Sequence, residues 1–388
     1  MNNTYCRKKP KNRPLSRRHF LKLIATGVLA GCAPKLTPQP TDEPAATMPP
    51  SPTTAPTDTP TAVLPTNTPT THPPNNPPTA PPNTHTPTPP PTLTPAPVAR
   101  PHVLGKVVHT RHAGVWDGGD LQSNAIRQML DASITQLTGL DDARAAWSAL
   151  FAPGERIALK VNTIAGASYW THIPLVTAVA DSLQDAGVPA EQIVIFDRLS
   201  RELQNVGYAL NTDGPGVRCY GTDHAYTGGW TLLDGSVGIS DVLLNCDALI
   251  NIPLLKTHGT SGISFALKNH YGTFDQPGRY HGNIEQALGA LNALDAIRDR
   301  TRLIIGDALN ICTQNWNSAV NGDSLLMSFD PVANDAIGLQ LFTAAREAAG
   351  GNANAAQRKA TAWLEYAASL GLGEHAPEAI EKVEVNLA

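Results

Sequence analysis

The sequence predicts an α/β protein: a mostly parallel sheet with helices on both faces, in a single large domain that follows a disordered stalk. Three observations predict this class. Short apolar segments alternate with helical patterns over residues 102–388, as in β-α-β construction. Of the 34 prolines, 24 lie between Pro34 and Pro101, so this part cannot bury enough apolar surface to fold. The remaining length is enough for one substantial core.

Strands and helices are expected in a regular order along the domain. Apolar runs predict strands at 106–110, 156–162, 192–197, 217–221, 248–253, 302–308 and 382–387. Amphipathic patterns predict helices near 121–138, 141–150, 172–187, 199–206, 283–299, 331–347 and 354–370. Gly187 ends one predicted helix and Pro331 stands near the start of another, which are the positions that glycine and proline favour.

The first 32 residues have the pattern of an export signal. A basic segment with the pair Arg17 and Arg18 precedes a short apolar stretch, and the sequence LAGC then ends at Cys32. This order resembles a twin-arginine signal peptide with a lipobox, although an ordinary signal peptide with an incidental cysteine has a similar pattern. The apolar stretch is shorter than the roughly 20 residues that span a bilayer. We expect a lipoprotein, anchored to the membrane through lipid on Cys32 at the extracytoplasmic face of a bacterial cell membrane.

Residues 33–101 are rich in proline and threonine, which predicts a disordered linker that extends in the polyproline II conformation. The whole chain has a formal net charge of −4, and eight positive charges precede Cys32, which leaves the remainder at −12. An acidic domain is a poor partner for a polyanion. We therefore expect no nucleic-acid partner.

The three cysteines of the domain, Cys219, Cys246 and Cys312, are far apart and form no C-x-x-C pair. We therefore expect no cysteine-ligated iron–sulfur cluster. One disulfide with a thiol left over is compatible with an oxidising compartment, but three small buried apolar side chains are the preferred interpretation.

Polar residues gather where the predicted strands end. Lys160 and Asn162 close the second strand, Asp197 the third, and Asp307 the sixth, while Lys256 follows the fifth. Ligands of open parallel sheets bind outside the carboxyl ends of the strands, where the loops diverge. A single charge at such a position is usually just solvated, but several strand ends together indicate one shared cleft.

Five separated motifs resemble one family. LINIPLLKTH is followed by SFALKNHYG, and IALKVN, IVIFD and FDPVANDAIG occur in the same chain. These stretches are similar to the bacterial and archaeal family known as domain of unknown function 362, and the similarity covers about 100–388. The resemblance implies no particular activity. Some members carry a ferredoxin-like cysteine cluster, which this chain lacks.

The segment 251–275 combines lysine, histidine and glycine in a way that suits an anion. Lys256 and His258 share one side of an extended stretch, and Lys268 lies within a helix that we expect at 262–271. Gly259 and Gly262 allow a close backbone approach, and the N-terminus of that helix favours a carboxylate or phosphate. His258 is a candidate general acid or base, or alternatively a histidine that fixes the loop. The predicted catalytic residues are Lys256, His258, Lys268 and Asp307, and the predicted substrate-binding residues are Lys160, Asn162, Asp197 and Asn269.

The cofactor is not identified by the sequence. A divalent metal would draw on imidazole and carboxylate ligands, and His270, His281 and Asp330 are weak candidates without a recognised spacing. There is no Walker A loop, no G-x-G-x-x-G motif and no G-x-S-x-G elbow. Trp230 and Trp316 lie in polar loops and are placed to line a cleft.

Two functions of different classes remain open. The first is an enzyme that acts on a small anionic substrate at the carboxyl-terminal rim of the sheet. The second is a non-catalytic, lipid-anchored protein that binds an anionic ligand in the same cleft. Only the enzyme needs groups that bind the transition state better than the ground state.

Overall fold

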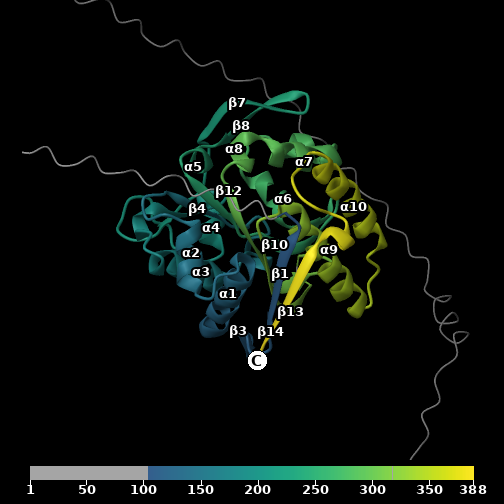
Figure 1. Ribbon diagram of the computed structural model, residues 1–388. Helices are drawn as coiled ribbons and strands as arrows, with labels where there is room; N and C mark the ends of the chain where they lie inside the picture. The colour runs from purple at the N-terminus through teal and green to yellow at the C-terminus, as the bar shows by residue number, and fades with distance from the viewer. Residues whose placement is uncertain (1–103, 317) are drawn as a thin grey trace, which may run out of the picture. The chain divides into compact units, whose positions relative to one another are not determined.

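The computed structural model describes residues 104–316 and 318–388, and the predicted signal peptide at 1–32 and linker at 33–101 lie outside them. The described residues form one α/β domain around a ten-stranded, mostly parallel sheet, which confirms the predicted fold class (Figure 1). The main path of the sheet runs through β14 (Glu381–Leu387), β1 (Lys106–His112), β13 (Ala319–Ser328), β12 (Thr301–Cys312), β9 (Ala248–Asn251), β4 (Ile157–Lys160), β5 (Ile193–Phe196) and β6 (Arg218–Cys219).

Every neighbouring pair along this path is parallel except the two pairs that contain β13. β10 (Leu254–His258) pairs in parallel with β12, and β11 (Gly262–Ser264) returns along β10 as the second strand of a hairpin. Because parallel strands end at one edge of a sheet, the chain after β4, β5 and β10 emerges on the same side of the domain.

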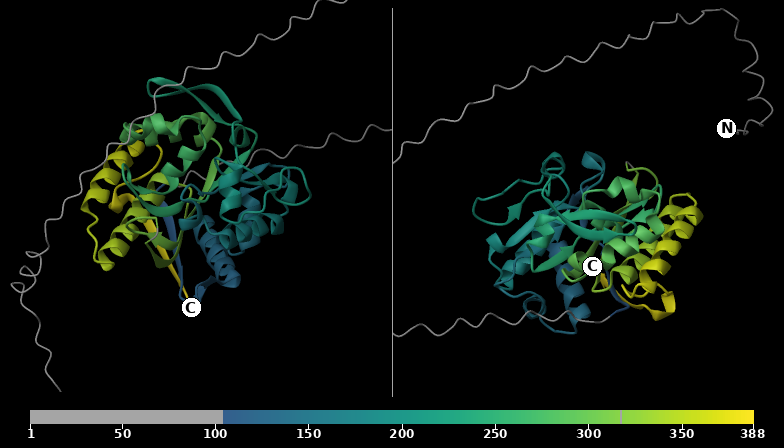
Figure 2. Two further views of the ribbon diagram at one scale, coloured as in Figure 1. Left: turned by 180° about the vertical axis from the view of Figure 1, so that it is seen from behind. Right: turned by 90° about the horizontal axis from the view of Figure 1, so that it is seen from above.

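The sheet separates two apolar cores. Val107 packs into one core and Val108 into the other, and Leu249 and Ile250 alternate in the same way. This alternation is the two-residue period of a strand that is buried on both faces. α1 (Ser123–Thr138), α2 (Ala143–Leu150), α3 (Ile173–Asp185) and α4 (Ser200–Asn205) cover one face. Figures 1 and 2 show the other face covered by α7 (Ile284–Ala293), α8 (Asp295–Arg298), α9 (Pro331–Ala348) and α10 (Asn354–Ser369).

Two helix boundaries are set by the residues that the sequence singles out. Gly187 follows α3 with a φ of 101°, and Pro331 is the first residue of α9. Asp330 is the N-cap of α9, and its carboxylate accepts hydrogen bonds from the backbone N–H groups of Val332 and Ala333. No helix within the described ranges is long and apolar enough to cross a membrane.

The predicted helix at 262–271 is wrong. Residues 262–264 form β11, and only α6 (Ala266–Asn269) and one turn of 3-10 helix over His270–Gly272 follow. Gly262 has a φ of 82°, and a Cβ there would lie 2.3 Å from the backbone oxygen of Ala356. The close approach of α10 therefore requires glycine at this position and places the segment in a hairpin.

Several further elements were not predicted. β13 is antiparallel to both of its neighbours, and its first half is exposed or half-buried while its second half is buried, so its sequence has neither a regular alternation nor one apolar run. The hairpin of β7 (Tyr226–Leu232) and β8 (Gly235–Ser240) lies at one end of the domain in Figures 1 and 2. Further short elements are β2 (Trp116–Asp117), β3 (Asp120–Leu121), α5 (Asp241–Leu244) and several single turns of 3-10 helix.

Cys219, Cys246 and Cys312 are all buried and free. Burial raises the pKa of Cys246 to about 12 and that of Cys219 to about 11. These thiols therefore pack as small apolar side chains, which agrees with the preferred interpretation of the sequence.

Candidate functional site

The ends of β4, β5 and β10 enclose a cavity of about 210 Å³. Seven of the eight residues that were predicted to bind or convert a substrate line this cavity. The distant parts of the chain that carry them therefore meet at one place. The lining consists of Lys160, Asn162, Ile164, Asp197, Arg198, Glu202, Lys256, His258, Ser264, Lys268, Asn269, Tyr271, Gly272, Pro277, His281 and Trp316. We call this cavity the lysine cleft.

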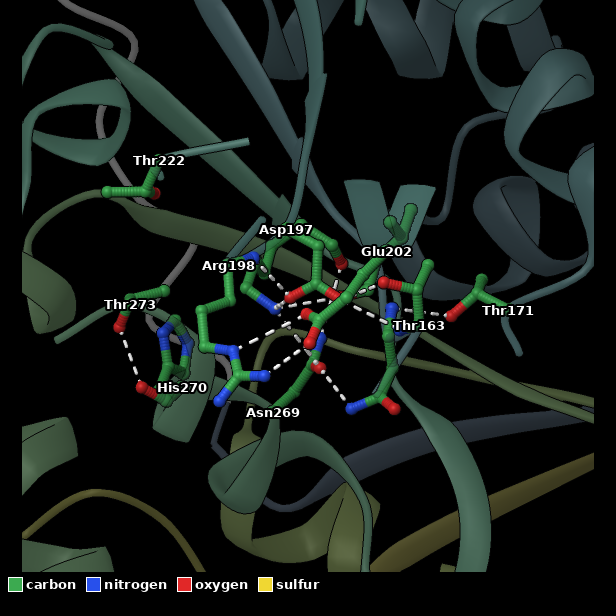
Figure 3. Close-up of polar contacts among 12 residues, drawn as sticks. Thr163, Thr171, Asp197, Arg198, Glu202, Thr222, Asn269, His270 and Thr273 are labelled. Carbon is green, nitrogen blue, oxygen red and sulfur yellow. Dashed lines mark hydrogen bonds and ion pairs between the residues drawn. The ribbon is translucent and has the colours of Figure 1, made fainter. Parts of the chain in front are cut away.

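One wall of the lysine cleft is a buried ion pair. Lys160 Nζ lies 2.7 Å from Asp197 Oδ1, and both side chains are almost fully buried. The other carboxylate oxygen of Asp197 accepts hydrogen bonds from the backbone N–H and the hydroxyl of Thr163, each at 2.7 Å (Figure 3). Burial by itself would raise the pKa of Asp197, but Lys160 and these donors outweigh it and hold the pKa below its usual value. Asp197 is therefore an ionised, fully satisfied anchor rather than a proton donor.

A directional chain of amides runs behind the cleft. Lys256 Nζ donates to Asn162 Oδ1 at 2.6 Å, which leaves the Asn162 amide nitrogen to donate to Asn269 Oδ1 at 3.0 Å. Asn269 donates in turn to Asn251 Oδ1 at 2.7 Å, and Asn251 donates to the backbone oxygen of Ala266 at 2.9 Å. Because the first donor is an ammonium group, it fixes the orientation of every amide that follows. The chain links β4, β9, β10 and α6 and holds Lys256 in place.

Two lysines of the cleft lack an acidic partner. Lys256 is 1% exposed and Lys268 is 5% exposed, and neither ammonium forms an ion pair with a carboxylate in the described part of the chain. Burial lowers the pKa of Lys256 to about 8, and the Asp197 carboxylate opposes this effect only in part. Burial and the nearby Lys256 lower the pKa of Lys268 to about 7. An anion bound between them would supply the missing negative charge.

The contacts of His258 agree with the second of the two roles that the sequence left open, a histidine that fixes the loop. Its Nδ1 accepts hydrogen bonds from the backbone N–H groups of Thr260 and Ser261, both at 3.3 Å, so the ring proton is on Nε2. Burial, followed by the charges of Lys268, His281, Lys256 and Lys359, lowers the pKa of His258 to about 3. The imidazole is therefore neutral near pH 7, and it is a hydrogen-bond donor rather than a general base.

Aromatic rings surround the second lysine. Lys268 Nζ lies 3.5 Å from the centre of the Tyr271 ring and 3.4 Å from His281 Nε2. His281 also stacks on His258, with 5.6 Å between the ring centres. At the rim, the Arg198 guanidinium is paired with Glu202, as Figure 3 shows, and the exposed side chains of Ile164 and Trp316 lie beside the cavity.

Asp307 is the predicted catalytic residue that does not line the lysine cleft. Its carboxylate accepts hydrogen bonds from the backbone N–H of His172 at 2.9 Å and contacts His172 Nδ1 at 2.8 Å. Asp307 therefore fixes the start of α3. It lies on β12, whereas the cleft is formed after β4, β5 and β10.

The helix N-terminus that was expected to bind an anion is already occupied. The carboxylate of Asp335, from α9, accepts hydrogen bonds from the backbone N–H groups of Ala266 at 2.6 Å and Leu267 at 3.0 Å. The group that satisfies the start of α6 is therefore a side chain of the protein itself, and burial raises the pKa of Asp335 to about 8. Sequence reasoning missed this partner, because Asp335 is 68 residues from Leu267 along the chain.

The weak metal candidates do not assemble. Asp330 caps α9, as described above, and His270 is fully buried beside Asn251. Only His281 reaches the lysine cleft. Within the described residues there is no group of three or more His, Cys, Asp or Glu side chains placed to hold a metal ion.

Seven residues that line the cleft were not predicted as site residues: Ile164, Arg198, Glu202, Ser264, Tyr271, Gly272 and Pro277. Arg198 and Glu202, for example, form an ordinary i,i+4 pair at a helix start, which is no signal of a site. The position of Trp316 in a polar loop did predict that it lines the cleft, and the centre of its ring lies 5.3 Å from Lys256 Nζ. Trp230, predicted by the same reasoning, instead donates to Asp295 and is not part of the lining.

The fold and this site define a parallel-sheet α/β protein with a buried, lysine-lined cleft at the carboxyl ends of its strands. Residues 157–340 match the sequence model of the family described as Domain of unknown function (DUF362), so this part of the domain belongs to the family that the sequence motifs resemble. The match contains every residue of the lysine cleft.

Comparison with other proteins adds two distant likenesses. A protein from Thermotoga maritima is 13% identical, with a TM-score of 0.33, and the match covers 66% of this chain and 60% of that one. The lactate racemase apoprotein from Thermoanaerobacterium thermosaccharolyticum is 11% identical, with a TM-score of 0.32 and coverage of 57% and 53%. The chain thus spans less than two thirds of the length of either protein. No curated protein sequence matches this chain.

Proposed function

We propose that the protein is an enzyme that binds a small anionic substrate in the lysine cleft. One observation carries the proposal: Lys256 and Lys268 are buried at one cavity without an acidic partner in the described chain. A buried ammonium group without a counter-charge is costly, and proteins keep such groups where a ligand supplies the charge.

The two lysines suit different tasks. Lys256, with a pKa of about 8, keeps its proton at neutral pH and is held by Asn162, so it is the natural contact for a carboxylate or phosphate. Lys268, whose pKa is lowered to about 7 by burial and by Lys256, contacts the Tyr271 ring and His281 Nε2 instead of an amide oxygen. One cation to hold the ligand and one amine to react with it favour an enzyme over a protein that only captures an anion.

Binding is tested by calorimetric titration of the full chain with phosphate and with pyruvate at pH 6.5. We expect Lys256→Met and Lys268→Met to weaken the affinity by about tenfold to a hundredfold each, the range of one charge-assisted hydrogen bond. Lys382→Met is the matched control, because Lys382 is exposed on β14 and pairs with Glu384. Equal affinities of the wild type and both cleft variants would refute the anion site.

Turnover is tested by proton NMR in D₂O with a panel of small carboxylates, oxo acids and phosphate esters. The enzyme is supported if the wild type converts a compound, or exchanges its hydrogens for deuterium, and Lys268→Met does not. Tight binding without any change in the panel supports the alternative, a lipid-anchored binding protein for an anionic ligand.

We also propose that lipid on Cys32 holds the domain at the extracytoplasmic face of the cell membrane. The support is the order of Arg17, Arg18, the short apolar stretch and Cys32 in the sequence. Cells grown with an alkyne-tagged fatty acid should label the wild-type chain and not Cys32→Ser. Replacement of Arg17 and Arg18 by lysine should leave the unprocessed chain inside the cell. Equal labelling of wild type and Cys32→Ser would contradict the anchor.

A further inference from the structure

Lys268 has the surroundings of a reactive amine rather than of a structural cation. Its Nζ lies at the cleft wall, and its nearest polar or aromatic contacts are the Tyr271 ring at 3.5 Å and His281 Nε2 at 3.4 Å. Lys160 is the contrasting case in the same cleft, because it is ion-paired with Asp197 at 2.7 Å. An amine that is desolvated next to another cation is the usual form of a nucleophilic lysine.

The hydrogen bonds of His281 assign its tautomer. His281 Nδ1 lies 2.7 Å from the backbone oxygen of Pro277, and an oxygen of this kind can only accept, so Nδ1 carries the ring proton. The lone pair of Nε2 therefore faces Lys268 Nζ. Burial and the charge of Lys268 lower the pKa of His281, which keeps this lone pair available near neutral pH. His281 is only half-buried, so a proton that it receives can pass to solvent.

The cleft also contains two groups that would orient a substrate. The Lys256 ammonium is fixed by Asn162 at 2.6 Å, and it is the stronger base of the two unpaired lysines. The Nε2–H of His258 is free to donate, because Nδ1 of the same ring is the acceptor of two backbone N–H groups. A carboxylate therefore has a cation to bind, and a neighbouring oxygen has a neutral donor.

We propose that Lys268 Nζ forms a Schiff base with the carbonyl carbon of a small oxo acid whose carboxylate is bound by Lys256. This proposal rests on the proposed function, since it needs the same anion site, and it names the substrate class. The Nζ lone pair attacks the carbonyl carbon, the C=O π pair moves to oxygen, and His281 Nε2 takes one proton from the nitrogen and delivers it to that oxygen. The nitrogen lone pair then expels the hydroxyl group, which takes a proton from solvent and leaves as water, so that a protonated C=N bond replaces C=O.

The test is reductive trapping on the full chain. Pyruvate or acetoacetate is added with cyanoborohydride at pH 7.5, and the product is analysed by intact mass and by peptide mapping. We expect one adduct per chain, located at Lys268, which excess propionate suppresses because propionate has the carboxylate but no carbonyl. Lys268→Met should lose the adduct and Lys382→Met should keep it. Adducts that are absent, or that are confined to other lysines of the wild type, would overturn the proposal.

A pH series separates this inference from simple anion binding. Trapping needs the neutral amine, so its rate should fall at least fivefold from pH 7.5 to pH 5.5, whereas the affinity for sulfate, which stays a dianion over this range, should rise. A trapping rate that rises with sulfate affinity would overturn the Schiff base. Phosphate binding without any adduct would refute the Schiff base and leave the anion site standing, while loss of both would refute both.

Discussion

Replacing Lys268 by methionine should stabilise the protein while it weakens anion binding. Methionine has a similar length and no charge, so it can fill the same space beside Tyr271 and His281. In the folded state the pKa of Lys268 is lowered from its ordinary 10.5 to about 7, because the side chain is buried and lies near Lys256. The unfolded chain has no such effect and keeps the ordinary pKa.

The size of the effect follows from this difference in pKa. Between about pH 7 and pH 10.5 the unfolded chain binds more protons than the folded one, so the free energy of unfolding rises with pH in that window. At about 1.4 kcal/mol per pKa unit, the penalty of this lysine is about 4 kcal/mol at pH 7 and about 2 kcal/mol at pH 9. We expect Lys268→Met to recover most of it, on the order of 2–4 kcal/mol at pH 7. That gain corresponds to an increase in Tm of roughly 4–8 °C for a domain of this size.

The assay is urea unfolding followed by circular dichroism at pH 7 and pH 9, with the wild type, Lys268→Met and Lys382→Met. The stabilisation should be larger at pH 7 than at pH 9, because the wild type loses its penalty as the pH rises. Lys382→Met should change the free energy of unfolding by less than about 1 kcal/mol, as is usual for an exposed ion pair. A Lys268→Met protein that is less stable than the wild type at both pH values would refute the reasoning, since it would mean that the lysine is paired.

Three further outcomes follow from the same contacts. Phosphate affinity should fall by about tenfold or more from pH 7 to pH 9, because Lys268 and Lys256 lose their protons near pH 7 and pH 8 in the free protein. If calorimetry shows no such fall, these two lysines are not the contacts of the anion. His258→Gln should keep phosphate affinity within about threefold at pH 6–8, because the glutamine amide is a neutral hydrogen-bond donor like the neutral imidazole. A large loss of affinity that is confined to low pH would show instead that the imidazole is charged. Gly272→Ala should cost about 1–3 kcal/mol in urea unfolding, because its Cβ would lie 2.9 Å from Asp197 Oδ1 and Lys160 Nζ, and Gly278→Ala, which meets nothing within 4 Å, is the control.

Most of the strands and helices could be predicted because their signals are local. A strand such as β4 is an apolar run that is buried on both faces, and α9 begins at a proline behind a capping aspartate. β11 and α6 could not be predicted in this way. Their conformation depends on Gly262 lying against α10 and on Asp335 binding the start of α6, and both partners come from much later in the chain.

The same distinction between local signals and contacts with distant parts of the chain applies to the site. The sequence by itself determined which polar residues end the strands, and parallel topology then required Lys160, Asp197 and Lys256 to meet at one edge. It could not determine what each residue does there. Only the tertiary structure shows that Lys160 is ion-paired with an acid, whereas Lys256 and Lys268 are not. It also shows that His258 is a neutral donor and that Asp307 binds His172 instead of lining the cleft. Protonation depends on burial and on the distance to neighbouring charges, and those quantities arise only when segments far apart in the chain pack together.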